Sequence, residues 1–246
     1  MRCSVCIATF NKCTWLTLTL ASILRRQLPP FEFEVIVVDD GSDDRTAHVC
    51  RRYPEVRYIR VDRNPVYRNP SVARNIAYKA ARGEVIIAQS DDVVHVTANT
   101  IERLVEELEE ETFSIATVYN TTVGGERVGL KEWPKIVQLT GPQNRRPFFF
   151  LGALRREHVY AVGGNDERYT APGRDESAFA DALVNGLGLS VRYVDVVGHH
   201  VDHPRPTNLR QLVQPSNAMY RRRVAACRAG RESWLSPGAP WEMQDD

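Results

Sequence analysis

EVIVVDDGSDDRT, at residues 34–46, and GEVIIAQSDD, at residues 83–92, share one pattern. In each, an apolar run typical of a buried parallel strand leads directly into a pair of aspartates. A third apolar run, at residues 3–9, leads into Phe10 and Asn11. Ligands of open α/β sheets bind at the carboxyl ends of the strands. We therefore expect these three strand ends to converge on one crevice.

Strands and helices alternate outward from these stretches. The expected strands of the first half are 3–9, 34–38, 56–60 and 84–88, and the expected helices are 15–26, 46–53, 70–81 and 100–110. This alternation predicts an α/β fold whose Rossmann-like, mostly parallel central sheet is flanked by helices. The second half predicts strands at 114–119, 148–154 and 191–197, a turn-rich loop at 160–170, and helices at 175–187 and 209–229.

Composition excludes several classes of protein. The 246 residues include 32 basic and 31 acidic ones, and this balance argues against a general nucleic-acid binder. No run approaches the roughly 20 apolar residues that span a bilayer, and the N-terminus lacks a signal-peptide pattern, so we expect a soluble, cytoplasmic protein. Five scattered cysteines do not form a disulfide framework. Cys3 and Cys6 lie three apart on a strand and should be buried thiols on opposite faces.

Several stretches resemble the family 2 glycosyltransferases and their GT-A relatives in the nucleotide-diphospho-sugar transferase superfamily. They are CSVCIATFNK, EVIVVDDGSDDRTA, SVARNIAYKAARGEVIIAQSDD, GALRREHVYAVGGNDERY, GRDESAFADAL and GHH, in the family's order over residues 2–203. The resemblance implies one GT-A domain at 1–203, with a nucleotide-sugar-binding half (1–113) and an acceptor half (114–203), followed by an Arg-rich helix and tail (204–246). It implies sugar transfer from a nucleotide diphosphate donor to an acceptor hydroxyl. Gln89 and Arg174 depart from the family, where acidic residues are common.

The resemblance also implies a metal site for Mn²⁺ or Mg²⁺. Asp92 would be the direct ligand, and Asp91 would share the metal or contact the ribose. A late histidine, His199 or His200, would complete the coordination, and since neighbours on a strand face opposite ways, at most one should point inward. His203 is a weaker candidate. The alternatives are a solvated or capping turn for the aspartates and structural histidines.

The donor site is expected to favour a UDP-sugar. A carboxylate after the second strand can accept the N3–H of uracil, and Asp40 fits that position better than Asp39. Arg74 would contact a phosphate or the base, with a surface ion pair as the alternative. The remaining residues expected at the nucleotide-sugar are Ala8, Thr9, Phe10, Asn11, Gln89 and Ser90.

Catalysis is expected to invert the anomeric centre, with Asp175 as general base and Glu176 as the second choice. The alternative for Asp175 is an acid that only stabilises a helix N-terminus. Contacts to the donor or acceptor sugar are expected from Trp133, Gly164, Asp166 and Glu167. The Arg-rich C-terminal helix offers a surface for a homodimer.

Three other functions remain open at this point. They are a retaining GT-A transferase, a sugar nucleotidyltransferase and a non-catalytic nucleotide-sugar-binding module. The nucleotidyltransferase is disfavoured because the first strand–helix turn, ATFNKCTW, lacks the glycines that cradle a triphosphate. The acceptor could be a glycan, a lipid-linked sugar, a protein or a modified nucleic acid.

Overall fold

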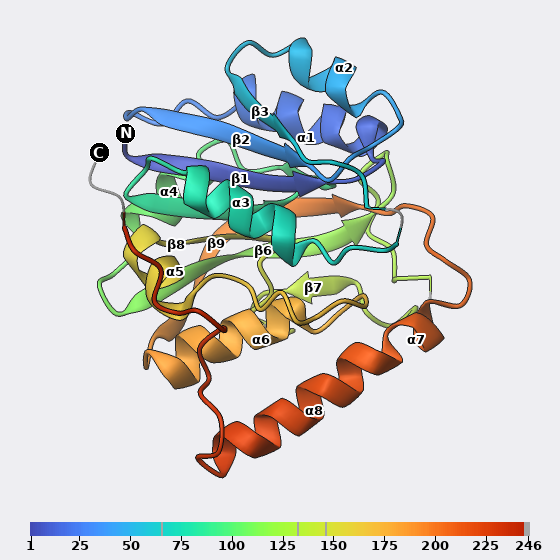
Figure 1. Cartoon of the computed structure of the whole chain (residues 1–246). Coiled ribbons are helices and arrows are strands. Elements are labelled where there is room, and N and C mark those ends of the chain that lie inside the picture. Colours follow the sequence, from blue (N-terminus) through green and yellow to red (C-terminus); the bar gives the residue numbers. More distant parts are fainter. Residues whose placement is uncertain (65, 132, 146, 244–246) are drawn as a thin grey trace.

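The structure, a computed structural model, describes residues 1–64, 66–131, 133–145 and 147–243. Within them, one sheet has the strand order β3-β2-β1-β4-β8-β6-β9-β5, with β7 paired to β6 (Figure 1). The strands are β1 (Cys3–Thr9), β2 (Phe33–Asp39), β3 (Val56–Arg60), β4 (Val85–Ser90), β5 (Val93–His95), β6 (Thr112–Thr121), β7 (Gln138–Thr140), β8 (Leu151–Arg155) and β9 (Ser190–Val201). The helices are α1 (Cys13–Leu24), α2 (Thr46–Arg51), α3 (Ser71–Ala80), α4 (Thr100–Glu106), α5 (Arg156–Val162), α6 (Asp175–Asp181), the π-helix η1 (Ala182–Gly186), α7 (Leu209–Leu212) and α8 (Gln214–Arg228).

The first four strands in space, β3-β2-β1-β4, are parallel, as predicted for the first half of the chain. In the registers, Thr9 lies opposite Asp39 and Ala8 lies opposite Ser90. The carboxyl ends of β1, β2 and β4 are therefore level, and the polar residues that follow them meet at one edge. The expected convergence of the three strand ends is confirmed.

Two hydrophobic cores cover the two faces of the sheet. Helices α1 and α4 pack on one face through Leu16, Leu20 and Ile101. Helices α3, α5 and α6 cover the other face (Figure 1), and their core includes Tyr78 and Phe179. Strand alternation sends Cys3 into the first core and Cys6 into the second. All five cysteines are free, so the expectation of buried thiols holds for this pair.

The second half is less regular than the sequence predicts. Strand β8 runs antiparallel to both β4 and β6, while β9 is parallel to β6. The expected strand at 148–154 begins only at Leu151, and the first residues of the expected loop at 160–170 are the last turn of α5. That helix ends at Gly163, whose φ of 73° provides the left-handed C-terminal stop.

The expected helix at 209–229 is two helices, α7 and α8. Pro215 stands in the first turn of α8 and has no backbone N–H to continue the bonds of α7. In Figure 1, α8 is the outermost helix beneath α6. The chain then returns past α5, where Trp241 donates its backbone N–H to Tyr160 O. Among the described residues, no helix has the length and apolar character needed to cross a bilayer.

Candidate active site

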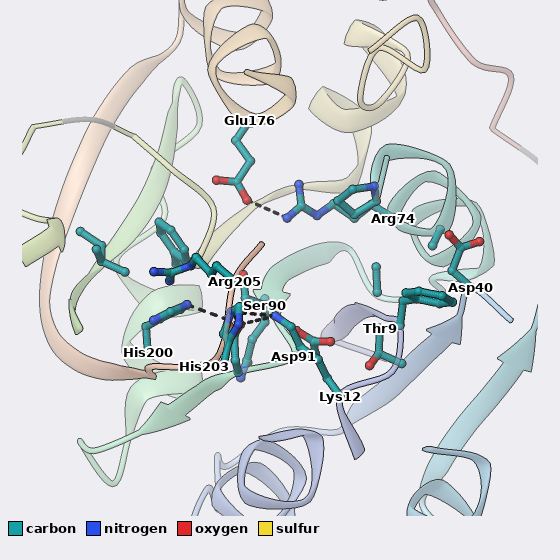
Figure 2. Close-up of a pocket in the computed structure, with 18 of the residues that line it drawn as sticks. Thr9, Lys12, Asp40, Arg74, Ser90, Asp91, Glu176, His200, His203 and Arg205 are labelled. Atoms are coloured by element: carbon teal, nitrogen blue, oxygen red, sulfur yellow. Dashed lines mark hydrogen bonds and ion pairs between the residues drawn. The ribbon is translucent and has the colours of Figure 1, made fainter. Parts of the chain in front are cut away.

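A cavity of about 450 Å³ opens at the carboxyl ends of β1, β2 and β4. Figure 2 shows side chains entering it from both halves of the chain, Asp40 and Lys12 from the first and Glu176 and His200 from the second. The expected site residues that line it are Ala8, Thr9, Phe10, Asp40, Arg74, Gln89, Ser90, Asp91, Asp92, Trp133, Glu176 and His200. The structure thus brings together most of the residues that the sequence singles out.

One wall of the cavity carries a cluster of possible metal ligands. Asp92 Oδ2 lies 3.4 Å from His200 Nε2 and 3.1 Å from His203 Nε2. One ligand atom from each of the three residues lies within 4.8 Å of the others. Asp92 Oδ1 is buried and has no hydrogen-bond partner among the described residues. Three electron-pair donors therefore converge where a cation can bind.

Hydrogen bonds to the far side of each imidazole set its orientation. Asn120 donates its amide to the carbonyls of Val128 and Gly129, so its Oδ1 faces His200 Nδ1, at 2.8 Å, as an acceptor. His203 Nδ1 lies 3.0 Å from Pro204 O, which is also an acceptor. Each neutral ring therefore carries its proton on Nδ1 and presents the Nε2 lone pair to Asp92. Such an outer acceptor is typical of histidines that bind metals.

Lys12 brings a positive charge into this cluster. Its ammonium donates to Asp92 Oδ2 at 2.5 Å and to Asp91 Oδ1 at 3.3 Å, and it lies 3.2 Å from His203 Nε2. Burial favours the neutral amine, but the two carboxylates outweigh it and raise the pKa of Lys12. Burial likewise opposes ionisation of Asp92, yet the Lys12 ammonium holds the pKa of that carboxyl well below its usual range. Asp91, for which burial is the largest effect, has a raised pKa.

The opposite wall of the cavity carries Asp40, the residue expected at the nucleotide base. Asp40 lines it and forms an ion pair with Arg68 at 2.9 Å, and burial raises the pKa of Asp40. Asp39 is fully buried instead. It accepts hydrogen bonds from Ser42 N, the Tyr58 hydroxyl and Arg60, so its carboxylate fixes the β2–α2 turn and β3. Of the two aspartates, Asp40 is the one that a ligand in the cavity can reach.

Two acidic residues of the second half meet Arg74 above the cavity. Arg74 donates to Asp175 Oδ2 at 2.9 Å and to Glu176 Oε1 at 2.7 Å (Figure 2 draws the Glu176 contact). Glu176 lines the cavity, whereas Asp175 is buried outside its lining. Burial raises the pKa of Glu176 despite the opposing charge of Arg74. Arg174, directly before this pair, has a left-handed φ of 69°, which is strained for a residue other than glycine.

Gln89 departs from the family's usual aspartate, and its amide is fixed by neighbours. Its Nε2 donates to Val93 O at 2.9 Å, and its Oε1 lies 2.8 Å from His95 Nε2. Burial lowers the pKa of His95 to about 3. The position beside the aspartate pair therefore contributes a neutral, oriented amide instead of a third negative charge.

Some expected site residues lie elsewhere. His199 faces a second cavity together with Gly125, on the side of β9 away from His200. Asn11 is outside the lining and joins Ser42 Oγ and Asp43 N across the loops. The three residues expected at a sugar contact other parts of the protein instead. Gly164 lies against Trp241, Asp166 pairs with Arg168 and Arg223, and Glu167 accepts a hydrogen bond from Asn75.

No sequence pattern assigns a role to Lys12, and His203 is only a weak candidate for a metal ligand. One feature of the sequence does point to His203, which follows His200 by three residues. Because β9 ends at Val201, the chain can turn there and bring His203 back beside His200. Lys12 carries no such signal. Tyr67, Arg68 and Arg205 also line the cavity without having been singled out.

The profile of glycosyl transferase family 2 matches residues 4–164 of the 246. The chain therefore belongs to glycosyl transferase family 2. The match includes the strand ends that carry Asp40, Asp91 and Asp92, and it stops before Glu176 and the histidines.

Curated relatives match in parts. Poly(ribitol-phosphate) beta-N-acetylglucosaminyltransferase TarS of Staphylococcus aureus is 35% identical over 97 residues, which cover 39% of this chain and 17% of TarS. This chain thus corresponds to a minor part of that relative's length. An uncharacterized glycosyltransferase of Mycoplasma pneumoniae is 24% identical over 225 residues, covering 85% of this chain and 71% of that protein.

Solved structures share the fold. The mannosyltransferase PcManGT of Pyrobaculum calidifontis, in complex with GDP-Man and Mn²⁺, has a TM-score of 0.63 at 18% identity and covers 96% of this chain and 66% of its own. TarS residues 1–349 of S. aureus, in complex with UDP, has a TM-score of 0.57 at 20% identity, covering 82% of this chain and 59% of its own. The fold of this chain is GT-A.

Proposed function

We propose that this protein is a metal-dependent glycosyltransferase that moves a sugar from a nucleotide diphosphate to an acceptor hydroxyl. The observation that carries the proposal is the convergence of Asp92 Oδ2, His200 Nε2 and His203 Nε2 within one wall of the cavity. Family membership and the sugar-transferase names of the relatives support the same reaction class.

The donor set favours Mn²⁺ over Mg²⁺. Magnesium prefers oxygen ligands throughout, whereas manganese also accepts imidazole nitrogens, so a set of one carboxylate and two imidazoles suits manganese better. Asp92, His200 and His203 would bind the ion, with Asp91 beside them. When bound, the ion supplies Lewis-acid stabilisation of the negative charge on a departing diphosphate.

We propose UDP as the nucleotide of the donor. Asp40 presents an acceptor for the N3–H of uracil at the far end of the cavity from the metal ligands, with Thr9 and Phe10 beside it. TarS has been solved with UDP and PcManGT with GDP-Man, so the affinity for UDP should be compared with the affinity for GDP. The acceptor is a hydroxyl of a glycan or similar polyol. Trp133, which is 39% exposed and lines the cavity, offers a ring on which such a molecule can stack.

The reaction is a single displacement with inversion. The acceptor oxygen attacks the anomeric carbon, its proton passes to a carboxylate, and the bond to the nucleoside diphosphate breaks. The sequence pointed first to Asp175 as that base. Both carboxylates bond Arg74, and we assign the proton to Glu176 because it lines the cavity and has a raised pKa, whereas Asp175 is buried outside the lining.

Binding measurements test the donor and metal parts of this proposal. Calorimetric titration with UDP and with GDP, each with and without Mn²⁺, should give tight binding for UDP in the presence of Mn²⁺ and weaker binding for the other combinations. The stereochemical part is read from the anomeric proton coupling of the product by NMR, using an array of polyol acceptors. A retained anomer would exclude Glu176 as the base of a single displacement, and equal binding of GDP would exclude recognition by Asp40.

A further inference from the structure

Lys12 contacts the same atoms that are expected to bind the metal. Its ammonium lies 2.5 Å from Asp92 Oδ2 and 3.2 Å from His203 Nε2. The Lys12 side chain is 26% exposed, against 4% for the Asp92 side chain, so the ammonium lies between the buried ligands and the open cavity. An ammonium and a divalent cation compete for one carboxylate oxygen, because like charges at such distances repel strongly.

The backbone at Lys12 is fixed while its side chain is long. Asn11 adopts a left-handed φ of 52° and is bonded through its N–H to Ser42 Oγ and through its Oδ1 to Asp43 N. This turn directs Lys12 into the cavity at the point where α1 begins. The flexible four-carbon stem allows the ammonium to move by rotation about its own bonds without any change in the turn.

Two other cations of the cavity are engaged away from the ligand cluster. Arg68 pairs with Asp40, and Arg74 pairs with Asp175 and Glu176. Arg205, which lies near the cluster in Figure 2, has its Nη1 3.5 Å from Asp202 Oδ1. Lys12 instead pairs with the carboxylate of Asp92 itself.

We propose that Lys12 is an exchangeable cation that couples metal binding to binding of the donor's diphosphate. Without metal, its ammonium neutralises Asp92 and meets the converging lone pairs of the cluster. When a divalent cation takes Asp92 Oδ2, the ammonium moves into the cavity and donates to the diphosphate oxygens that arrive with the metal. This inference rests on the proposed function, since it requires both a metal and a nucleotide diphosphate.

Opposite effects on two affinities distinguish this exchange from a structural role. Lys12→Met removes the competing charge, so the Kd for Mn²⁺ without nucleotide, read from the electron paramagnetic resonance of free Mn²⁺, should fall about tenfold. It also removes a diphosphate contact, so the calorimetric Kd for UDP at saturating Mn²⁺ should rise about tenfold. Lys12→Arg, which keeps the charge, should leave Mn²⁺ affinity near that of the wild type and provides a second reading if Lys12→Met unfolds.

Lys79→Met is the matched control, because Lys79 lies on α3 against Trp241 and lines a different cavity. It should leave both affinities unchanged, and melting temperatures verify folding of all variants. If the wild type binds Mn²⁺ and UDP but Lys12→Met leaves both affinities unchanged or weakens both, only the proposed exchange is overturned. Wild-type protein that binds neither ligand would overturn the proposed function and the exchange together.

Discussion

Replacing Glu176 by glutamine tests the assignment of the general base. The substitution keeps the size of the side chain and its ability to accept a hydrogen bond from Arg74, which now lies 2.7 Å from Glu176 Oε1. Arg74 also retains Asp175 at 2.9 Å, so its charge stays paired. The variant should therefore fold, bind UDP with Mn²⁺ as the wild type does, and fail in proton transfer.

The expected loss follows from the chemistry of the site. A positioned general base contributes about 10²–10⁴ in rate, and we expect the turnover of Glu176→Gln to fall within that range. This corresponds to about 3–5 kcal/mol of transition-state stabilisation. Asp175→Asn removes a carboxylate that bonds Arg74 and does not line the cavity, and it should cost about tenfold through looser positioning of Glu176.

The pH profile gives a second reading. Because burial raises the pKa of Glu176, the wild type should lose turnover as pH falls through a value above that of an ordinary glutamate, where the base takes up its proton. Glu176→Gln should lack this acidic limb. The assay is UDP release at saturating donor and acceptor, with melting temperature as the folding control. If Asp175→Asn lost a thousandfold while Glu176→Gln stayed within tenfold of the wild type, the assignment would be wrong and Asp175 would be the base.

Three further predictions concern the donor, the metal and stability. Asp40→Asn should weaken UDP binding by about tenfold, because an amide can turn only one acceptor oxygen toward the uracil N3–H. Calorimetric titrations with UDP and with GDP measure how much of the preference for UDP is lost. Asn120→Leu should weaken Mn²⁺ binding by about 10–100-fold by releasing the His200 ring, as read by electron paramagnetic resonance, while UDP binding without metal should not change. His95 has a folded pKa of about 3, so as pH falls below the ordinary histidine value the wild type should lose about 1.4 kcal/mol of stability per pH unit from this group, a slope that His95→Leu should remove from urea unfolding curves.

The first half of the chain could be predicted because its pattern is local. The apolar runs of β1, β2 and β4 are buried parallel strands, and parallel pairing places the residues after each run at the same edge. Strand β5, which pairs antiparallel with the distant β9, was not predicted. Asp40, Asp91 and Asp92 follow from this rule without any knowledge of distant contacts. The rule does not say which of two adjacent aspartates faces the ligand. In the structure, the carboxylate of Asp39 accepts hydrogen bonds from Tyr58 and Arg60 and does not face the cavity.

What the sequence could not predict depends on contacts between distant segments. Lys12 and His203 are 191 positions apart, and no local pattern indicates that their side chains lie 3.2 Å from one another. Asp166 and Glu167 are expected at the sugar because residues 163–167 resemble the loop that precedes the base in the family. The structure instead engages Asp166 with Arg223 of α8 and Glu167 with Asn75, away from the cavity lining. Their proposed contact with a sugar stays a prediction.

Helix α3 explains how Glu176, the proposed general base, keeps its place although the second half is irregular. Arg74 donates to Asp175 and Glu176 at the start of α6, and Asn75 donates to the backbone carbonyl of Asn165 and accepts from its backbone N–H. One turn further on, Tyr78 stacks on Phe179 of α6 at a ring-centroid distance of 6.1 Å. A single helix of the first half thus fixes the start of α6 and the loop before it by charge, hydrogen bonds and packing. The loops around Trp133 are outside this set of contacts, so they can change with the acceptor while Glu176 stays aligned with the donor cavity.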